Sequence, residues 1–556
     1  MALSHSFIFS HFWKSPGPGR DCRDQVEKSR LPGPGLKSES RPGCPGRDQS
    51  RCTPKYVPFP ETVLFLSKKD ELSQEVVDAK EKELEKLKEN KVYSVVPYTG
   101  QKLISSKWHI TEKYKEGERV VKARLVARGF EEDNKNLRTD SPTCSREAMR
   151  IVYFVSVMMS WILMSLDFTS AFLQGEEIDR KIFLKPPRDV CTKSEVWSLK
   201  KCLYGLNDAP RSWYVKVRKS LISLGGVQSL FDGALFLWHS DEGNLEGILA
   251  SHVDDFVYCG NENFRIKVIQ NLKKMFKIGE EGSGNFRYVG LNVSQNGREV
   301  KLDQNDYVAS IEQIKISKAR RENPDSLLTE EEKSELKQLA GQMIWASSQT
   351  RPDVAYEVCQ MSNTGKNPTV RMISEANRAV SKLKKKNVSI TFKKLGSPED
   401  LKVEVYSDAT HASLNDGASQ GGFVIFLKGK GGKTVPMSWK SKRLQRVTKS
   451  PLASETSALA EGADAGYLLA SLVKEVFRLP SAPPIHCKTD SKSLVQTLHT
   501  SKSVSDQRLK VDIARLREMT QNDEITVSWV PGKMQISDPL TKHTATTTGL
   551  LDAICA

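Results

Sequence analysis

The chain of 556 residues lacks the cysteine spacing that a zinc site or a disulfide framework would need. Its ten cysteines are scattered, and no two of them stand in a Cys-x-x-Cys pair. Zinc knuckles and small disulfide-stapled scaffolds are therefore excluded. A reducing, intracellular compartment is the expected setting for such a chain.

No segment of the sequence has the pattern of a secretory signal or a membrane anchor. The Phe-Ile-Phe cluster at 7–9 is too short for the apolar part of a signal peptide. The most apolar stretch, 149–166, has the length of a membrane span, but Arg150 and Asp167 stand at its ends and serines interrupt it. We therefore predict a core helix that runs into a core strand, and no membrane partner.

Residues 1–55 differ in composition from the rest of the chain. Pro-Gly pairs recur at 16–19, 32–35 and 42–46. Proline and glycine at this density cannot build a packed core, so we predict a disordered tail.

The charge of the whole chain is strongly basic. Lysine and arginine number 84 against 68 aspartates and glutamates, which gives a net charge of +16. This balance favours a polyanion such as a nucleic acid as the partner.

Two adjacent acids, Asp254 and Asp255, stand in the apolar run 248–258. The run predicts two short strands folded back on each other with the acids at the bend. Adjacent carboxylates raise each other's pKa unless a positive group lies between them. A divalent metal is the usual partner, and ligands that are all oxygen suit magnesium. The alternative is an ordinary Asp-Asp turn.

A second apolar strand, within 162–172, ends at Asp167. Three acids brought together from two strands can hold two magnesium ions. Two such ions activate an attacking hydroxyl and stabilise the leaving pyrophosphate, which is what a nucleotide polymerase requires. The alternative is that Asp167 merely forms a turn at a strand end.

A second group of acids follows the Gly396-Ser397-Pro398 step, which we interpret as a boundary. Asp408 and Asp490 end predicted strands, and Glu455 lies in the first turn of a predicted long helix. Asp538 lies in a further predicted strand, 536–540. Four acids on separate elements are unfavourable unless a metal neutralises them. Singly, Glu455 could be a helpful charge in the first turn of a helix, and Asp408 or Asp490 could simply end strands.

Several motifs together resemble the reverse transcriptase of copia-type retrotransposons. They are Lys-Ala-Arg-Leu-Val-Ala-Arg-Gly-Phe at 122–130, Leu-Asp-Phe-Thr-Ser-Ala-Phe-Leu-Gln-Gly at 166–175, Cys-Leu-Tyr-Gly-Leu-Asn-Asp-Ala-Pro-Arg-Ser-Trp-Tyr at 202–214, His-Val-Asp-Asp-Phe at 252–256 and Thr-Arg-Pro-Asp-Val-Ala-Tyr at 350–356. Their order and spacing agree with the family over roughly residues 75–545. The acids Asp, Glu, Asp, Asp on a strand–strand–strand–helix–strand–helix layout over 401–545 likewise resemble a ribonuclease H domain.

These resemblances imply an α+β fold, a right-hand polymerase with fingers, palm and thumb joined to a mixed α/β ribonuclease H-like domain. The expected domains after the tail are fingers and palm over 68–310, a helical thumb or connection over 311–396, and the nuclease over 401–545. Helices are predicted over 68–91, 262–276 and most of 328–386, and a hairpin over 100–130.

The resemblances also imply the metal-binding residues, with two Mg²⁺ ions in each active site. The polymerase acids are Asp167, Asp254 and Asp255. The nuclease acids are Asp408, Glu455, Asp490 and Asp538, which would activate water to cut the RNA strand of a hybrid.

Other positions match the family's substrate contacts. Arg124 matches the arginine that contacts the incoming triphosphate, and Lys122 lies on the same strand face. Phe172 matches the steric gate that excludes a ribose 2′-hydroxyl, and Tyr204 and Gly205 match the segment along the nascent base pair. The alternatives are surface charges at Arg124 and Lys122 and a core aromatic at Phe172.

Some positions depart from the family pattern. His252 replaces an aromatic residue that usually precedes the Val-Asp-Asp triplet. Asn207 and Asp208 stand where Lys and Gln are common, and an acid there is unfavourable beside phosphates. No histidine lies between Trp529 and Asp538, where several relatives have one.

The implied function is RNA-directed DNA synthesis with ribonuclease H activity, in an intracellular chain acting in the cytoplasm with access to the nucleus. The implied partners are an RNA template, a DNA primer, the RNA–DNA hybrid and deoxynucleoside triphosphates. No protease or integrase motif is found, so we expect the polymerase–nuclease part of a longer polyprotein. The alternative is a catalytically inactive or co-opted copy that binds nucleic acid without turnover.

Overall fold

The computed structural model describes residues 64–65, 73–115, 118–132, 136–190, 194–363, 365, 367–414, 416–500 and 504–555. All of them belong to one compact unit, Phe59–Ala556. The tail predicted over 1–55 lies outside the described residues.

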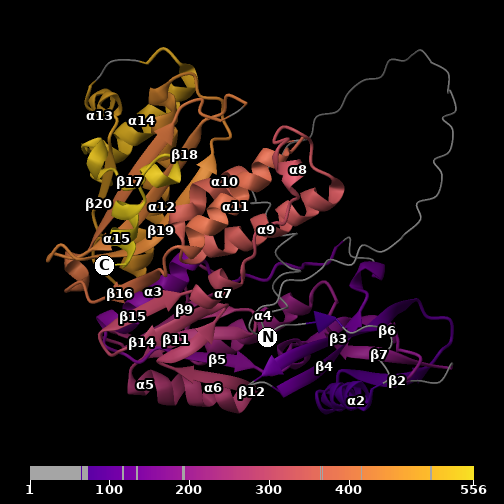
Figure 1. Cartoon of the computed structure of the whole chain (residues 1–556). Coiled ribbons are helices and arrows are strands. Elements are labelled where there is room, and N and C mark those ends of the chain that lie inside the picture. Colours follow the sequence, from indigo (N-terminus) through magenta and orange to yellow (C-terminus); the bar gives the residue numbers. More distant parts are fainter. Residues whose placement is uncertain are drawn as a thin grey trace, which may run out of the picture. The chain divides into compact units, whose positions relative to one another are not determined.

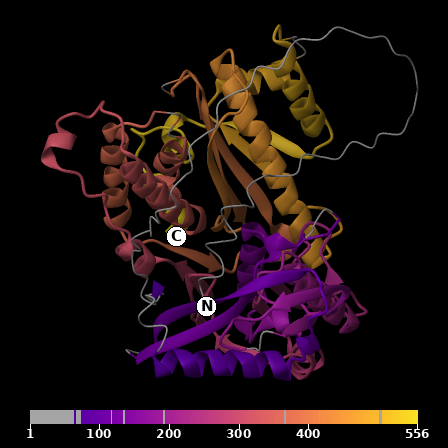
Figure 2. The same ribbon diagram turned by 90° about the vertical axis from the view of Figure 1, so that its right-hand side faces the viewer.

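The first sheet has six strands in the order β1-β3-β6-β7-β2, with β4 paired to β3. Its strands are β1 (Leu64–Phe65), β2 (Tyr93–Pro97), β3 (Leu103–Lys115), β4 (Glu118–Ala127), β6 (Glu177–Lys185) and β7 (Glu195–Lys201). The hairpin β3–β4 confirms the prediction over 100–130. Helix α2 (Gln74–Glu89) lies along β4 (Figure 2) and buries residues at helical spacing: Val76, Ala79, Glu83 and Leu87.

The second sheet has ten strands in the order β16-β15-β14-β13-β12-β5-β11-β10-β9-β8. The strands are β5 (Met164–Phe168), β8 (Val227–Gln228), β9 (Leu235–His239), β10 (Leu245–His252), β11 (Asp255–Gly260), β12 (Ile278–Ser283), β13 (Asn285–Tyr288), β14 (Leu291–Gln295), β15 (Glu299–Asp303) and β16 (Ser389–Lys393). The central strand β5 lies between β11 and β12, at the middle of the chain's largest sheet (Figure 1).

Helix α3 (Arg146–Met158) begins at Ser145, whose side chain accepts a hydrogen bond from the Ala148 N–H. Every residue from 148 to 158 is buried, and β5 follows within six residues. The prediction of a core helix running into a core strand is therefore confirmed. None of the helices in the described part of the chain has both the length and the apolar content needed to cross a bilayer.

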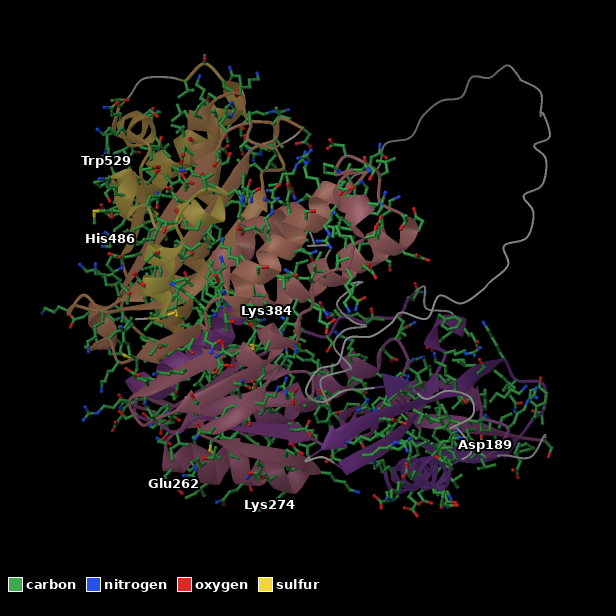
Figure 3. The ribbon with its side chains drawn as sticks, in the orientation of Figure 1. Asp189, Glu262, Lys274, Lys384, His486 and Trp529 are labelled. Atoms are coloured by element: carbon green, nitrogen blue, oxygen red, sulfur yellow. The ribbon has the colours of Figure 1, made fainter. Side chains whose placement is uncertain are left out.

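Helices flank and extend this sheet. They are α4 (Ala209–Ser223), α5 (Glu262–Phe264), a π-helical turn η4 (Arg265–Ile269), α6 (Gln270–Met275), α7 (Asn305–Ser310), α8 (Lys318–Arg321), α9 (Glu330–Gln349), α10 (Ala355–Ser362) and α11 (Val370–Lys384). The helices predicted over 262–276 and 328–386 are thus present. Lys384 at the end of α11 donates a hydrogen bond to the Ala309 carbonyl oxygen at 2.9 Å, so the basic end of this helix is turned back onto α7 (Figure 3).

The Thr350–Tyr356 motif has a structural role in this part of the fold. The buried Arg351 guanidinium pairs with both carboxylate oxygens of Asp353, at 2.9 and 2.8 Å. It also donates to the Lys386 carbonyl oxygen at 3.2 Å. The motif therefore holds the backbone that follows α11 in place, through the hydrogen bond from Arg351, before β16 begins.

The third sheet has five strands in the order β19-β18-β17-β20-β21, the first three antiparallel and the last two added in parallel. The elements are β17 (Lys402–Thr410), β18 (Gln420–Lys428), β19 (Thr434–Arg443), α12 (Pro451–Phe477), β20 (Ile485–Thr489), α13 (Lys492–His499), α14 (Gln507–Gln521), β21 (Ile525–Trp529) and α15 (Thr548–Cys555). This order contains the predicted strand–strand–strand–helix–strand–helix layout. The predicted fold of mixed helices and strands is confirmed.

Two local predictions were wrong. Helix α12 begins at Pro451, so Glu455 is its fifth residue and not a first-turn charge. The segment 536–540 is not a strand, because Asp538–Leu540 form a 3₁₀ turn, η8, with Pro539 at its start. Proline has no N–H for a strand ladder and its fixed φ suits the first turn of a helix.

A continuous apolar core joins the second and third sheets. It runs from the buried face of α3 through Ile390 and Phe392 of β16 to Val435 and Met437 of β19. Strand β16, which follows the helical segment in the chain, thus completes the second sheet and packs against the third (Figure 1).

Candidate active sites

The paired aspartates lie at the bend between β10 and β11. His252 ends β10 and pairs with Asp255, which begins β11. The bend residue Val253 has φ +60°, a left-handed conformation that a β-branched side chain rarely adopts. Its carbonyl oxygen accepts a 2.7 Å hydrogen bond from the Trp213 indole.

Asp167, on β5, lies directly opposite Asp255 in the β5–β11 ladder. The Phe168 N–H donates to the Asp254 carbonyl oxygen at 3.1 Å, which ties the bend to β5. On the other side of β5, a Cβ added at Gly279 would lie 2.3 Å from Asp167 Oδ2. The absence of a side chain at Gly279 therefore lets β12 close over this carboxylate.

The electrostatics of this group favour a bound cation. Burial, with the nearby charges of Asp254 and Glu280, raises the pKa of Asp167 to about 6. Burial and the other two aspartates raise the pKa of Asp255 well above its usual value. Both carboxylate oxygens of Asp167 are buried and make no hydrogen bond of normal geometry, although the Glu280 N–H lies close enough to lower the pKa somewhat.

The three acids nevertheless do not form a closed cage. Within the described residues, one group of three acids brings one oxygen from each within 4.8 Å of the others, and that group is in the third sheet. Asp167 and Asp255 are paired in the β5–β11 register, and the charge of Asp254 raises the pKa of both, but the three carboxylates are further apart than in that group.

The predicted substrate contacts gather around Tyr204. The Arg124 guanidinium lies 5.5 Å from the Tyr204 ring centroid. Phe172, in the 3₁₀ turn η3 (Ala171–Gln174), is half-buried with its ring 5.6 Å from Tyr204. Lys122 is exposed. Its positive charge partly offsets the rise in the pKa of Asp167, so Lys122 faces the site formed by the aspartates of β5 and the β10–β11 bend.

Gly205 has a role that the sequence interpretation did not include. Its φ is +90°, and an added Cβ would lie 2.1 Å from the Ala127 carbonyl oxygen. The Ala127 N–H donates to the Tyr204 carbonyl oxygen at 2.7 Å. Glycine is therefore required for the 203–206 segment to dock against the end of β4, whatever else it contacts.

Asp208 does not present a free charge. It is buried, and both of its oxygens accept hydrogen bonds from Arg180, at 2.6 and 2.8 Å. The same guanidinium pairs with Glu132 at 2.5 Å, and the Asn207 amide donates to the Gly129 carbonyl oxygen at 3.2 Å. Asn207 and Asp208 thus both make contacts within the protein. Because the Asp208 carboxylate is buried and paired, the repulsion of phosphates that we expected from it does not apply.

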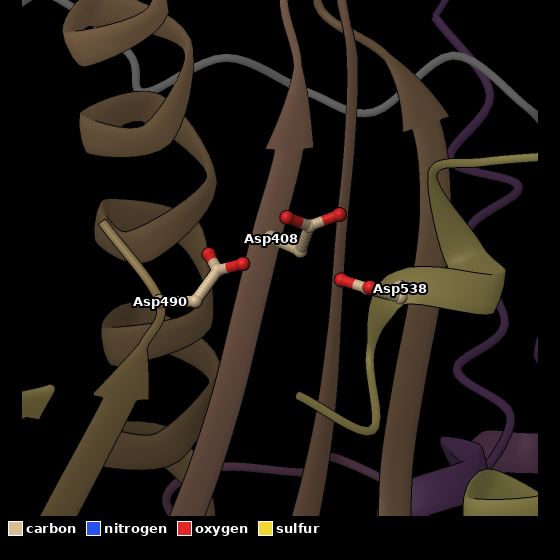
Figure 4. A group of neighbouring side chains, drawn as sticks. All are labelled: Asp408, Asp490 and Asp538. Atoms are coloured by element: carbon tan, nitrogen blue, oxygen red, sulfur yellow. The ribbon is translucent and has the colours of Figure 1, made fainter. Parts of the chain in front are cut away.

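The second site is a compact triad. Asp408 on β17, Asp490 directly after β20 and Asp538 on η8 each place a carboxylate oxygen within 4.8 Å of the other two (Figure 4). The neighbouring strands β17 and β20 are parallel, so their ends bring Asp408 and Asp490 to the same edge. Such a set of oxygens can hold a divalent metal.

Glu455, on α12, completes the acidic surroundings without joining the triad. Burial, followed by the charges of Asp408 and Asp490, raises the pKa of Glu455 to about 9, and its Oε2 atom is buried without a hydrogen-bond partner. Burial and Asp408 likewise raise the pKa of Asp538 to about 6. These groups fit a cation, which would favour their charged forms.

Two residues that the sequence interpretation missed touch the triad. The Lys542 ammonium lies 3.0 Å from Asp538 Oδ1 and 3.3 Å from Asp408 Oδ1. The Thr541 hydroxyl donates to Asp408 Oδ2. The spacing of four residues between Asp538 and Lys542 is the one signal that the sequence offered for this pairing.

The end of β21 lies beside the triad, just before the segment that contains no histidine. Trp529 donates from its indole to the Asp490 carbonyl oxygen at 3.1 Å and remains 41% exposed (Figure 3). Lys492 lies over its ring at 4.6 Å. An aromatic face and a cation therefore border Asp490, which suits contact with a sugar–phosphate chain.

Comparisons with known proteins fit this geometry. Residues 90–323 match the family described as reverse transcriptase (RNA-dependent DNA polymerase). The Retrovirus-related Pol polyprotein from transposon RE1 of Arabidopsis thaliana is 27% identical over 463 residues, 79% of this chain and 31% of that protein. The polyprotein from transposon TNT 1-94 of Nicotiana tabacum is 25% identical over 500 residues, 84% of this chain and 36% of that protein. This chain therefore spans about a third of these relatives.

Among solved structures, a foamy viral protease-reverse transcriptase in complex with double-stranded DNA is similar at 13% identity, with a TM-score of 0.49 over 82% of this chain and 70% of that one. LC11-RNase H1 is similar at 16% identity, with a TM-score of 0.20 over 25% of this chain and 92% of that one.

Proposed function

We propose that this chain copies RNA into DNA and cleaves the RNA of the resulting hybrid. The proposal is supported by the match of residues 90–323 to the reverse transcriptase family and by the similarity of the chain to transposon Pol polyproteins. The polymerase site is the β10–β11 bend with β5, and the nuclease site is the edge of the third sheet. The domains would follow the predicted bounds, with the helical 311–396 segment between the two sites.

Mg²⁺ is the metal we propose for both sites, with two ions in each. Asp167, Asp254 and Asp255 would hold it in the polymerase, and the buried oxygens of Asp167 support this assignment. Bound there, the metal supplies positive charge for hydroxyl activation and pyrophosphate departure. Arg124 would bind the triphosphate, and the half-buried Phe172 ring would exclude a ribose 2′-hydroxyl.

In the nuclease, four acids would hold the metal: Asp408, Glu455, Asp490 and Asp538. The compact triad and the orphaned Glu455 oxygen support this assignment. Trp529 and Lys492 would position the hybrid beside Asp490 by ring and charge contacts with its backbone.

The proposed partners are an RNA template, a DNA primer, the RNA–DNA hybrid and deoxynucleoside triphosphates. The net charge of +16 supports backbone contacts. Recognition of shape and 2′-hydroxyls would give little base preference. The proposed place of action is the cytoplasm, with access to the nucleus.

The observation that carries the proposal is the presence of two separate acid groups, one at each site. The test is primer extension on an RNA template with Mg²⁺, run beside cleavage of a labelled hybrid. Asp254→Asn/Asp255→Asn should abolish extension and leave cleavage intact, whereas Asp408→Asn should do the reverse. Absence of both activities from the folded wild-type protein would refute the proposal.

A second candidate is a catalytically inactive copy that binds nucleic acid. The wider spacing of the polymerase acids and the replacement of an aromatic by His252 favour it. Such a protein would bind the hybrid with steep salt dependence and turn over nothing. In such a protein the wild type would show no primer extension, and Asp167→Asn would leave the affinity for the hybrid unchanged. In an active enzyme the wild type extends the primer, and Asp167→Asn stops extension.

A further inference from the structure

Lys542 lies inside the acid triad of the third sheet. Its ammonium contacts one oxygen of Asp408 and one of Asp538, at 3.3 and 3.0 Å. Oxygens of these two residues also belong to the triad that converges within 4.8 Å. A cation bound by the triad and the ammonium of Lys542 would therefore compete for the same two carboxylates.

The backbone that carries Lys542 is fixed to the sheet. The Leu540 carbonyl oxygen accepts a hydrogen bond from Ser441 at 2.6 Å, and the Thr541 carbonyl oxygen accepts one from Thr410 at 3.1 Å. A Cβ at Gly422 would lie 2.6 Å from Leu540 Cβ, so glycine on β18 lets this turn approach.

The Lys542 side chain, in contrast, has room to move. It is 33% exposed, whereas the Asp408 side chain is 1% exposed. A buried carboxylate with no counter-charge is strongly unfavourable, so Asp408 needs either the ammonium or a metal. The long, flexible side chain of Lys542 can move out into solvent when a metal binds.

We propose that Lys542 is an internal counter-ion of the nuclease site, which holds Asp408 and Asp538 together before a metal binds and leaves this pair when a divalent cation takes its place. The inference rests on the proposed nuclease function. It makes Lys542 a positioning residue that sets metal affinity.

The test is calorimetric titration of the full chain with Mn²⁺. All proteins carry Asp254→Asn/Asp255→Asn, so that the titration reports on the nuclease site. Lys542→Met should bind Mn²⁺ at least about tenfold more tightly, because one competing charge is removed. In EDTA its melting temperature should fall, and Mn²⁺ should raise it by more than in the parent.

Two variants are matched to Lys542→Met. Lys440→Met removes an exposed lysine of the same sheet and should match the parent in both measurements. Lys542→Arg keeps the positive charge and should bind Mn²⁺ no more tightly than the parent. If Lys542→Met is too unstable in EDTA to titrate while Lys542→Arg is stable, the counter-ion role is supported directly.

Unchanged or weaker Mn²⁺ binding by Lys542→Met would overturn the inference. Failure of the underlying function has a different signature. In that case Asp408→Asn would bind Mn²⁺ as the parent does, because the triad would not be a metal site.

Discussion

The indole N–H of Trp213 donates a 2.7 Å hydrogen bond to the carbonyl oxygen of Val253, the residue before the paired aspartates. Trp213 is itself buried against Phe168 and Phe276, with ring centroids 5.2 and 5.3 Å away. The left-handed Val253 costs about 1–3 kcal/mol, so it persists only where its surroundings fix it. Trp213 is therefore one of the side chains that hold the bend in place.

Trp213→Phe should therefore reduce primer extension by more than its loss of stability explains. Removing the indole N–H leaves the Val253 carbonyl without this donor, at about 1–3 kcal/mol of unfolding free energy. The control is Trp238→Phe, which removes a similar 3.0 Å bond to the Leu224 carbonyl oxygen in the same aromatic cluster. Urea unfolding should give similar losses for the two, with extension lowered only in Trp213→Phe.

Gly279→Ala should inactivate DNA synthesis while hybrid cleavage continues. The new Cβ would lie 2.3 Å from Asp167 Oδ2, so either the carboxylate or β12 must shift. Gly341→Ala on α9 meets nothing within 4 Å and should leave extension unchanged. Wild-type extension by Gly279→Ala would mean that the tight approach of β12 has no part in placing Asp167.

Arg150→Lys should destabilise the whole chain by about 1.5–3 kcal/mol, the range for a lost hydrogen bond to a charged group. The buried Arg150 donates to the Met437 and Gln349 carbonyl oxygens, both at 2.9 Å, and lies 4.0 Å over the Trp439 ring. A lysine cannot reproduce this planar, forked contact.

The matched change is Arg146→Lys, on the same helix, where the guanidinium makes one 3.1 Å bond to Ser348 and is less buried. Denaturant unfolding followed by tryptophan fluorescence measures both variants. Equal losses would show that Arg150 is not the main link between α3 and the third sheet.

Without metal, the unfolding free energy should fall as pH rises from about 5 to 9. The pKa of Glu455 is raised from 4.5 to about 9 in the folded chain, so between these values the folded state holds a proton that the unfolded state releases. Stability from this group is complete below pH 4.5 and is lost as pH approaches 9. Glu455→Gln should flatten the slope in EDTA, which thermal melts across the range will measure, and an unchanged slope would contradict the burial of this carboxyl.

Local sequence patterns predicted the parts of the sites that depend on neighbouring residues. The apolar run 248–258 predicted the β10–β11 hairpin, because apolar strands on both sides of two acids leave few other arrangements. The strand ending near Asp167 was found in the same way, and β11 does pair with it.

Features of the sites that depend on contacts between residues far apart in the sequence could not be predicted in this way. The sequence marks Asp208 as an anomaly, but its neutralisation by Arg180, 28 residues upstream, follows from the folded sheet. The collision that keeps a side chain out of position 279 likewise needs β12 to lie beside β5. Asp538 was predicted to lie in a strand, whereas Pro539 beside it favours the 3₁₀ turn.

Strand β16 has a practical consequence for anyone who wishes to divide the molecule. A fragment ending at residue 388, after the helices, would lack the edge of the ten-stranded sheet and leave β15 unpaired on one side. A fragment ending at 400 would keep that edge but uncover Phe392 and Ile390, which the third sheet now covers. Either truncation exposes an unpaired strand edge or an apolar surface, both of which promote self-association. Recombinant work on one of the two acid sites should therefore use the intact 59–556 unit and inactivate the other site by point substitution.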